Sequence, residues 1–325
     1  PKPDGDAWFR AGSLTRARSR YGFDVRADRE GRLVVSIAGE ETTLDLPGGA
    51  SCMAKAPGLV AAGGGRGEVR VWSVPGFEEE ARFQSATGIE WLELLHGHGL
   101  IAIGLTSKET TIWSLEHPSR QISVAGAGDH CGALSADGSK LNLGTRGGAV
   151  RAVPLVEAAE LLRGEEAARG PVRMDVFEAP VPGAHFGATW SIAVSPDGRH
   201  LATTGHDGAL KIWRTDRPGE ILDLEGHDGV SWGVAFSPDG RWLASGAARP
   251  DPERGEIILR RVPGWEIEAR IEGHDLLVTA LAFLPDRNIF VSGSLDRKVM
   301  LWSLDDPEAP PRLLHQFEQT VTSLA

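Results

Sequence analysis

The sequence predicts an all-β fold assembled from seven repeats of a four-stranded antiparallel unit. Three observations support this prediction: an apolar strand ending in Trp recurs, a turn containing Pro, Asp and Gly recurs, and Gly and Pro are abundant. The 41 Gly and 20 Pro indicate many short segments separated by tight turns. A chain of 325 residues is long enough for one large all-β domain.

The strand that ends in Trp is the clearest repeat. The four strong copies end at Trp72, Trp113, Trp213 and Trp302. Weaker copies replace the Trp, with Ser36, Val153 and Arg260 at the equivalent positions. Most of these seven positions are spaced by about 40 residues, close to the roughly 40 to 45 residues of a four-stranded propeller blade.

Two of the spacings are longer, and each contains a segment that explains it. Residues 155–169 (LVEAAELLRGEEAAR) are rich in Ala, Leu and Glu, which predicts a short amphipathic helix inserted in the fourth unit. Residues 246–255 (GAARPDPERG) carry two Pro, which predicts a lengthened turn in the sixth unit. Both insertions are expected to leave the repeat itself intact.

A second repeat lies at a fixed place between the strands. Residues 195–198 and 237–240 read Ser-Pro-Asp-Gly, and weaker copies occur at 135–138 and 284–286. Pro presets φ at the second turn position, and Asp and Gly suit the positions that follow, so each copy should reverse the chain into a hairpin. The unit is therefore strand A, turn, strand B, turn, strand C ending near Trp, and strand D.

These motifs resemble those of the WD-repeat (WD40) β-propeller family. The resemblance rests on the Ser-Pro-Asp-Gly turns, on Gly-His pairs ending at His227 and His274, and on Asp207 and Asp296 six residues before a Trp. It covers residues 21–325, although Ser or Arg follows each Trp where the family has Asp. The resemblance implies a seven-bladed β-propeller that serves as a non-catalytic interaction, sensing or scaffold domain.

The ends of the chain predict how the ring of blades closes. Residues 21–27, 33–37 and 42–46 match strands B, C and D, and residues 321–325 match strand A. Together they would complete the seventh blade and leave no open sheet edge. The expected organisation is an N-terminal extension at 1–20 and one propeller at 21–325; the abrupt ends could also mark a fragment, or the start of a second propeller.

Two repeats carry a full set of polar and aromatic groups that the resemblance assigns to a buried hydrogen-bond tetrad. The members of these two sets are His185, Thr203, Asp207 and Trp213, and His274, Ser292, Asp296 and Trp302. A His beside an Asp and a hydroxyl also suggests a hydrolase, but a catalytic triad is a single site and does not recur at equivalent strand positions. We therefore expect a structural role. His227 with Ser245 is an incomplete third copy, because the lengthened turn displaces the Asp and Arg260 replaces the Trp.

Two Trp residues occupy the same place in strand A of adjacent repeats, and they are the candidate contacts for a partner. We expect Trp190 and Trp232 to lie near the rim of the ring, where exposed aromatic groups make a binding hot spot. The alternative is that both indoles only pack between blades. Neighbouring positions that complete the candidate face are Val230, Leu277, Thr279, His206 and Leu295.

Other residues that could suggest a metal site, a phosphate loop or a disulfide have simpler explanations. His96 and His98 form the only close His pair, but no Asp, Glu or Cys nearby completes a metal site. The glycines of 63–67 join two strands, whereas phosphate loops open a helix. Cys52 and Cys131 form no CxxC motif, so neither a disulfide framework nor zinc is predicted. We expect no metal and no cofactor.

Charge and hydropathy exclude several partners. A formal net charge of −11 disfavours a phosphate-binding surface, so nucleic acid is not expected. No apolar run approaches the ~20 residues that span a bilayer, and the chain opens without the apolar segment of a signal peptide. The expected partner is a protein or peptide, or another domain of the same parent chain, in the cytoplasm.

Three functions remain open from the sequence. The first is the non-catalytic interaction module. The second is a propeller enzyme with a central-channel site, such as a lactonase-like hydrolase or a quinone oxidoreductase, although strand A positions here offer Trp, Thr, Ser and Val rather than converging acids. The third is a sensing or autoinhibitory part of a larger bacterial-type protein. The helix expected at 155–169 offers a side-on alternative to the Trp-bearing face.

Overall fold

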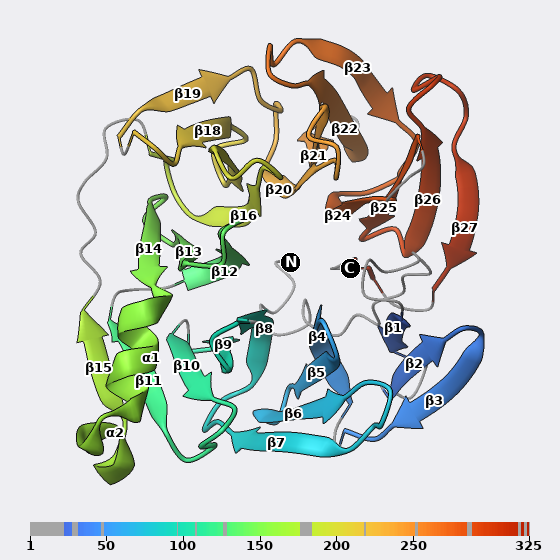
Figure 1. Ribbon diagram of the computed structural model, residues 1–325. Helices are drawn as coiled ribbons and strands as arrows, with labels where there is room; N and C mark the ends of the chain where they lie inside the picture. Colours follow the sequence, from blue (N-terminus) through green and yellow to red (C-terminus); the bar gives the residue numbers. More distant parts are fainter. Residues whose placement is uncertain are drawn as a thin grey trace, which may run out of the picture.

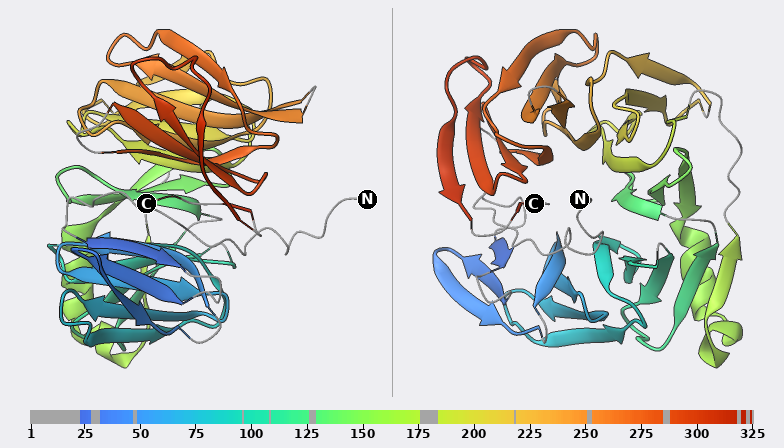
Figure 2. Two further views of the ribbon diagram at one scale, coloured as in Figure 1. Left: turned by 90° about the vertical axis from the view of Figure 1, so that its right-hand side faces the viewer. Right: turned by 180° about the vertical axis from the view of Figure 1, so that it is seen from behind.

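The computed structural model describes most of the chain, and the predicted extension at 1–20 lies outside the described residues. The described residues are 23–27, 32–46, 49–95, 97–107, 109–125, 129–175, 184–217, 219–250, 253–284, 288–317, 320–321 and 324. Within these ranges the strands fall into seven sheets. Figures 1 and 2 show the sheets arranged side by side around a central axis.

The first three sheets contain the strands up to β11. They are β1 (Phe23–Ala27), β2 (Leu33–Ile37) and β3 (Glu40–Leu44); β4 (Ala50–Ala56), β5 (Leu59–Gly64), β6 (Glu68–Ser73) and β7 (Glu79–Gln84); and β8 (Ile89–Leu95), β9 (Leu100–Leu105), β10 (Thr110–Ser114) and β11 (Gln121–Ala125). Neighbouring strands within each of these groups are antiparallel. Within each group, strands that follow one another in the chain pair with one another, as predicted for the repeating unit.

The fourth sheet and the helical insertion come next. The elements are β12 (Asp129–Leu134), β13 (Lys140–Thr145), β14 (Val150–Pro154), α1 (Leu155–Arg163), α2 (Glu165–Arg169) and β15 (Val172–Asp175). The predicted helix therefore forms as two helices, divided at Gly164. β15 does not complete this sheet; it pairs in parallel with β11 and becomes the fifth strand of the preceding sheet.

The last three sheets have four antiparallel strands each. They are β16 (Thr189–Val194), β17 (His200–Gly205), β18 (Leu210–Arg214) and β19 (Ile221–Leu224); β20 (Ser231–Phe236), β21 (Trp242–Pro250), β22 (Glu253–Arg261) and β23 (Ile267–Glu272); and β24 (Val278–Phe283), β25 (Ile289–Ser294), β26 (Lys298–Ser303) and β27 (Arg312–Gln316). The prediction of a lengthened turn at 246–255 was wrong. β21 and β22 remain paired as a hairpin through this segment, with β21 ending at Pro250 and β22 beginning at Glu253.

Burial explains the apolar pattern of the strands. The middle strands β9 and β13 are buried along nearly all their length, because sheets on either side cover both of their faces. Outer strands such as β7 and β23 alternate exposed and buried residues, because only one of their faces meets a neighbouring sheet. Figure 1 shows β4, β8, β12, β16, β20 and β24 closest to the axis.

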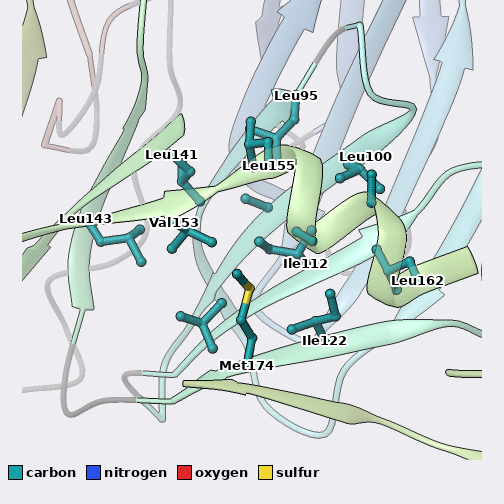
Figure 3. Packing of buried hydrophobic residues seen from close by; sticks show 14 residues of the cluster. Leu95, Leu100, Ile112, Ile122, Leu141, Leu143, Val153, Leu155, Leu162 and Met174 are labelled. Carbon is teal, nitrogen blue, oxygen red and sulfur yellow. The ribbon is translucent and has the colours of Figure 1, made fainter. Parts of the chain in front are cut away.

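The helical insertion contributes to the core (Figure 3). Leu155, Ala158, Ala159 and Leu162 form the buried face of α1. They pack in one cluster with apolar residues of the third and fourth sheets, such as Ile112. Each fully buried Leu contributes about 1.5 to 3 kcal/mol. This burial holds α1 between the two sheets and explains why the chain after β14 leaves its own sheet.

The predicted ring closure involves the three-stranded sheet β1–β2–β3 and the C-terminus. No strand from the described residues pairs with the free edge of β1. Val321 is buried, and a Cβ added to Gly293 would lie 2.4 Å from its Cγ1. Val278 stands in the same relation to Gly246, where the corresponding distance is 2.7 Å. Val321 thus occupies the place where strand A of a following blade begins.

Candidate functional site

Each inner strand carries an irregularity at one equivalent residue. The register with the neighbouring strand skips a single residue near the start of six inner strands, which is the geometry of a β-bulge. The skipped positions are Ser51, Glu90, His130, Trp190, Trp232 and Thr279. A bulge re-aims the side chain at the extra residue and is common next to binding sites.

Three consecutive bulge positions carry aromatic rings that contact one another. The rings of Trp190 and Trp232 are stacked, with centroids 4.4 Å apart and an interplanar angle of 15°. The ring of His130 also contacts Trp190, and the centroids of these two rings are 4.8 Å apart. Because each ring comes from a different sheet, the stack joins three sheets near the axis. Both indoles are partly exposed.

The indole of Trp190 differs from an ordinary packed Trp. Its Nε1 is buried and has no hydrogen-bond partner among the described residues. By contrast, the indoles at the ends of the strand C repeats, such as Trp213, donate to a hydroxyl. Leaving a buried donor unpaired costs about 1 to 3 kcal/mol. The bulge stack is therefore not optimised for stability alone.

Two aromatic residues of this region were missed from the sequence. His130 lies three residues before Ala133, as Trp190 lies three before Ala193, so the strand A alignment could have found it. Phe186 follows the tetrad residue His185 and is 90% exposed. We use the term aromatic face for His130, Phe186, Trp190 and Trp232.

The remaining predicted contact residues are not equivalent to one another. Thr279 is buried, and its single O–H lies within hydrogen-bond distance of the carbonyls of both Gly293 and Val321, so its side chain is part of the packing between these segments. Leu295 and Leu277 are half-buried and joined by a backbone hydrogen bond of 3.0 Å. No ring contact or hydrogen bond among the described residues links these two leucines to the tryptophan stack.

Two more predicted contact residues remain available at the surface. His206 is exposed, and its backbone N–H donates to Ala188 at 2.9 Å. Val230 is half-buried and immediately precedes β20, the strand that carries Trp232. Both lie in connections beside the inner strands of the two tryptophans.

The first predicted tetrad is assembled between β17, β18 and the loop before β16. Trp213 Nε1 donates to Thr203 Oγ1 at 2.7 Å, and this hydroxyl lies 2.8 Å from Nε2 of His185. Nδ1 of His185 lies 2.8 Å from Asp207 Oδ1. An indole can only donate and a carboxylate can only accept, so the hydrogen bonds run in one direction, from Trp through Thr and His to Asp.

The second tetrad has the same geometry in the last sheet. Trp302 Nε1 donates to Ser292 Oγ at 2.7 Å, which lies 2.7 Å from His274 Nε2. His274 Nδ1 donates to Asp296 Oδ2 at 2.8 Å. The hydroxyls of both tetrads belong to fully buried residues, so no substrate can reach them. This burial supports structural rather than hydrolytic sets.

The third set contains a carboxylate that the sequence did not predict, but it has no indole. His227 Nε2 lies 2.9 Å from Ser245 Oγ, and Nδ1 lies 2.6 Å from Oε2 of Glu256. Glu256 lies in β22, beyond the extended hairpin, and its longer side chain reaches the position that Asp fills elsewhere. Arg260, which stands at the Trp position, donates to the backbone carbonyls of Glu225 and Trp265 and not to Ser245.

The carboxylates of these sets remain ionised and the buried imidazole of the first set remains neutral. Burial would raise the pKa of Asp207, but hydrogen bonds from the Phe186 N–H and from His185 outweigh it and lower that pKa. The same balance lowers the pKa of Asp296 and of Glu256, where the His donates in each case. Burial lowers the pKa of His185 below its usual 6.5.

We expect the free energy of unfolding to fall as pH is lowered from about 7 to about 5. The unfolded chain takes up a proton at His185 below 6.5, while the folded state resists it, so acid favours unfolding. Below the usual 3.8 of Asp, the lowered pKa of Asp207 acts in the same direction. Urea titrations at a series of pH values measure this slope.

The control for the pH experiment is His185→Asn, whose amide retains a donor close to the position of Nδ1. The wild-type slope between about pH 7 and pH 5 should exceed that of this variant. A wild-type stability that stays constant or rises with acidification would contradict the assignment of a neutral His185.

The other motifs are structural where the structure describes them. His96 lies outside the described residues, and His98 Nε2 hydrogen-bonds the Gly138 carbonyl at 2.9 Å. Gly67, with φ of +82°, turns the chain between β5 and β6, so the glycines at 63–67 do join two strands. A search of the described residues found no group of three or more His, Cys, Asp or Glu positioned to hold a metal. No helix in the described ranges is long and apolar enough to cross a membrane.

Comparison with known proteins identifies repeats in the same part of the chain as the last three sheets. The family model "WD domain, G-beta repeat" matches residues 180–214, 219–249 and 265–303. The chain is 33% identical over 139 residues to "Protein hir-1" of Neurospora crassa and 35% identical over 125 residues to "Protein HIR1" of Phaeosphaeria nodorum. These alignments cover 35% of this chain and only 13% and 12% of the fungal proteins. Such relatives give no support to the expectation of a bacterial type.

Solved structures share the arrangement of sheets. The β-propeller domain of Cps50 (Swd1) from Myceliophthora thermophila has a TM-score of 0.70 at 12% identity, covering 90% of this chain and 96% of that one. The computationally designed Ika8 protein has a TM-score of 0.67 at 17% identity, covering 96% and 88%. At such identities the likeness shows the fold alone. Residues 180–214, 219–249 and 265–303 are therefore WD repeats (WD40), and the arrangement of the sheets is that of a β-propeller.

Proposed function

We propose that this propeller is a non-catalytic interaction domain that binds a protein or peptide through its aromatic face. The observation that carries the proposal is the stack of Trp190 on Trp232, formed at bulges of adjacent inner strands and left partly exposed. Large aromatic side chains that are partly exposed and held rigidly are the residues that dominate binding energy at protein interfaces.

The surroundings of the stack support the same function. Phe186 is 90% exposed and is anchored by its backbone N–H, which donates to Asp207 at 2.8 Å. The tetrad thus fixes the loop that presents an exposed aromatic ring. His130 extends the stack by one more ring. A preorganised aromatic surface binds without a large loss of conformational entropy.

We expect the double variant Trp190→Ala, Trp232→Ala to lose a specific partner that the intact chain captures from its native host. Truncating two hot-spot side chains costs about 2 kcal/mol or more each, which weakens binding by more than roughly a hundredfold. Affinity capture followed by measurement of Kd with the purified partner tests this expectation.

The matched control is Leu222→Ala, Leu313→Ala, which removes exposed apolar groups from the outer strands β19 and β27. This control should retain the partner, and both double variants should show unchanged melting. Equal binding by the wild type and the tryptophan variant would overturn the aromatic face as the binding surface. Copurification of a metal or small molecule without any protein partner would favour an enzyme instead.

The wider organisation is part of the same proposal. We infer one seven-bladed propeller over residues 21–325, in which the segment 321–325 adds to β1 and closes the ring. The position of Val321 against Gly293 supports this closure. We further propose that the protein works in a reducing compartment such as the cytoplasm, which the low content of two cysteines supports.

A further inference from the structure

The helical insertion α1–α2 lies on the outer rim of the sheets (Figure 1), and its side chains line an open groove. Its volume is about 490 Å³, within the roughly 300 to 1,000 Å³ typical of ligand pockets. The lining residues come from α1, α2, the junction between them and the first residue of β15. They are Glu157, Glu160, Leu161, Gly164, Glu165, Glu166 and Val172.

The floor of the groove is apolar. Leu161 is 37% exposed and lies outside the set of buried residues by which α1 packs into the core. Val172 is half-buried on the other side of the groove. Covering the exposed part of Leu161 would remove further apolar surface from water at about 25 cal/mol per Å².

The rim of the groove is acidic, with four glutamates and no basic residue in the lining. The only ion pair recorded for these glutamates among the described residues joins Glu165 to Arg169 at 3.7 Å, and both side chains are more than three-quarters exposed. Such an exposed pair is worth little and leaves the negative charge largely uncompensated.

Helix stability does not account for all of this charge. Glu157 and Glu165 lie in the first turns of α1 and α2, where the helix dipole favours an anion. Glu160 lies in the second half of α1, where the dipole is unfavourable to a negative group. Its place on the rim is better explained by a ligand of opposite charge.

A free sheet edge borders the groove. β15 is the outermost strand of its sheet, and no described strand pairs with its outer edge. Val172, which lines the groove, is the first residue of this strand. Unpaired backbone groups on an edge strand can receive an extended peptide.

We propose that this groove binds a basic, extended segment of a partner protein, with an apolar side chain on Leu161 and Val172 and Lys or Arg side chains on the four glutamates. Charge complementarity selects this occupant. A second copy of this chain would bring a net charge of −11 against the same glutamates, so self-association is disfavoured.

The first test is direct binding of a fluorescein-labelled peptide in which leucines alternate with arginines, measured by anisotropy at low salt. Two matched peptides separate the contributions: one replaces the leucines with serine, and the other replaces the arginines with glutamate. The proposal requires the first peptide to bind more tightly than both others, and more weakly when salt is raised. Equal binding of the serine peptide would reduce the site to a nonspecific acidic surface.

The second test places the peptide in the groove. Leu161→Ser should weaken binding by about tenfold, because it removes the apolar contact without adding charge. Glu157→Gln with Glu160→Gln should weaken it by several-fold, whereas Glu40→Gln with Glu80→Gln, the same charge change on distant strands, should not. Loss of affinity that is equal in the two double variants would overturn the proposal.

The aromatic face provides a further control, because the two surfaces are separate. The variant Trp190→Ala, Trp232→Ala should bind the peptide as the wild type does, whether or not it loses its captured partner. Failure of the groove and failure of the aromatic face are thereby distinguished. If Leu161→Ser unfolds the chain, Leu161→Ala gives a milder version of the same comparison.

Discussion

Replacement of Gly148 by alanine should lower the free energy of unfolding by about 3 kcal/mol or more. Gly148 has φ of +87°, a conformation that costs other residues about 1 to 2 kcal/mol. A Cβ at this position would also lie 2.0 Å from the backbone carbonyl oxygen of His185 in the next repeat. Backbone cannot move aside as a flexible side chain does, so a shift of His185 must follow.

Gly138→Ala is the matched control for this experiment. Gly138 also has a positive φ, of +70°, but nothing lies within 4 Å of an added Cβ. This control isolates the conformational strain, so its loss should be about 1 to 2 kcal/mol. Urea denaturation of the three proteins measures both effects. Losses of equal size would mean that the close approach between repeats contributes nothing to stability.

Removal of the tetrad carboxylate by Asp296→Ala should destabilise the chain by about 3 to 5 kcal/mol. Asp296 accepts hydrogen bonds from His274 and from the backbone N–H groups of Asp275 and Lys298, at 2.8, 3.0 and 2.8 Å. All three donors lose their acceptor in the variant. The buried imidazole is then left without a partner at Nδ1.

A surface carboxylate provides the comparison. Glu220 pairs with Arg217 at 3.4 Å, and both side chains are more than half exposed, so Glu220→Ala should cost less than about 1 kcal/mol. The pH dependence offers a second readout. The lowered pKa of Asp296 gives stability that is lost in acid, and the Asp296→Ala variant should lack this part of the acid sensitivity. A loss no larger than that of Glu220→Ala would show that the tetrad is not a main source of stability.

The third set shows why the tetrad pattern is only partly readable from sequence. The sequence pattern looks for an Asp six residues before a Trp, and this repeat has neither. In the structure the extended hairpin of β21 and β22 brings Glu256 to the same point in space, from a different place in the chain. A hydrogen bond depends on the position of the oxygen atom, so a longer side chain can supply it from a different backbone position.

The helical insertion illustrates the same limit. Its composition predicts a helix over 155–169, and helices form there. The break at Gly164 and the transfer of β15 to the neighbouring sheet do not follow from local sequence. They follow from the burial of α1 between two sheets, which carries the chain beyond β14 and leaves β11 as the nearest edge.

The bulge residues show what an alignment of the inner strands can and cannot predict. Trp190 and Trp232 are apparent from the sequence as aromatic residues at one repeat position. Their stacking, and the addition of His130, depend on the angle between adjacent inner strands. The sequence pattern locates the strands but not the extra residue that turns each side chain.

The sequence by itself determined the repeat, the strand order within a unit and the members of two tetrads, because these depend on spacing and turn chemistry within short segments. Only the tertiary structure decided which sheet received β15, which carboxylate joined the third set, and which rings met near the axis. Those outcomes depend on contacts between repeats, where packing of distant segments selects among arrangements that local sequence leaves equally open.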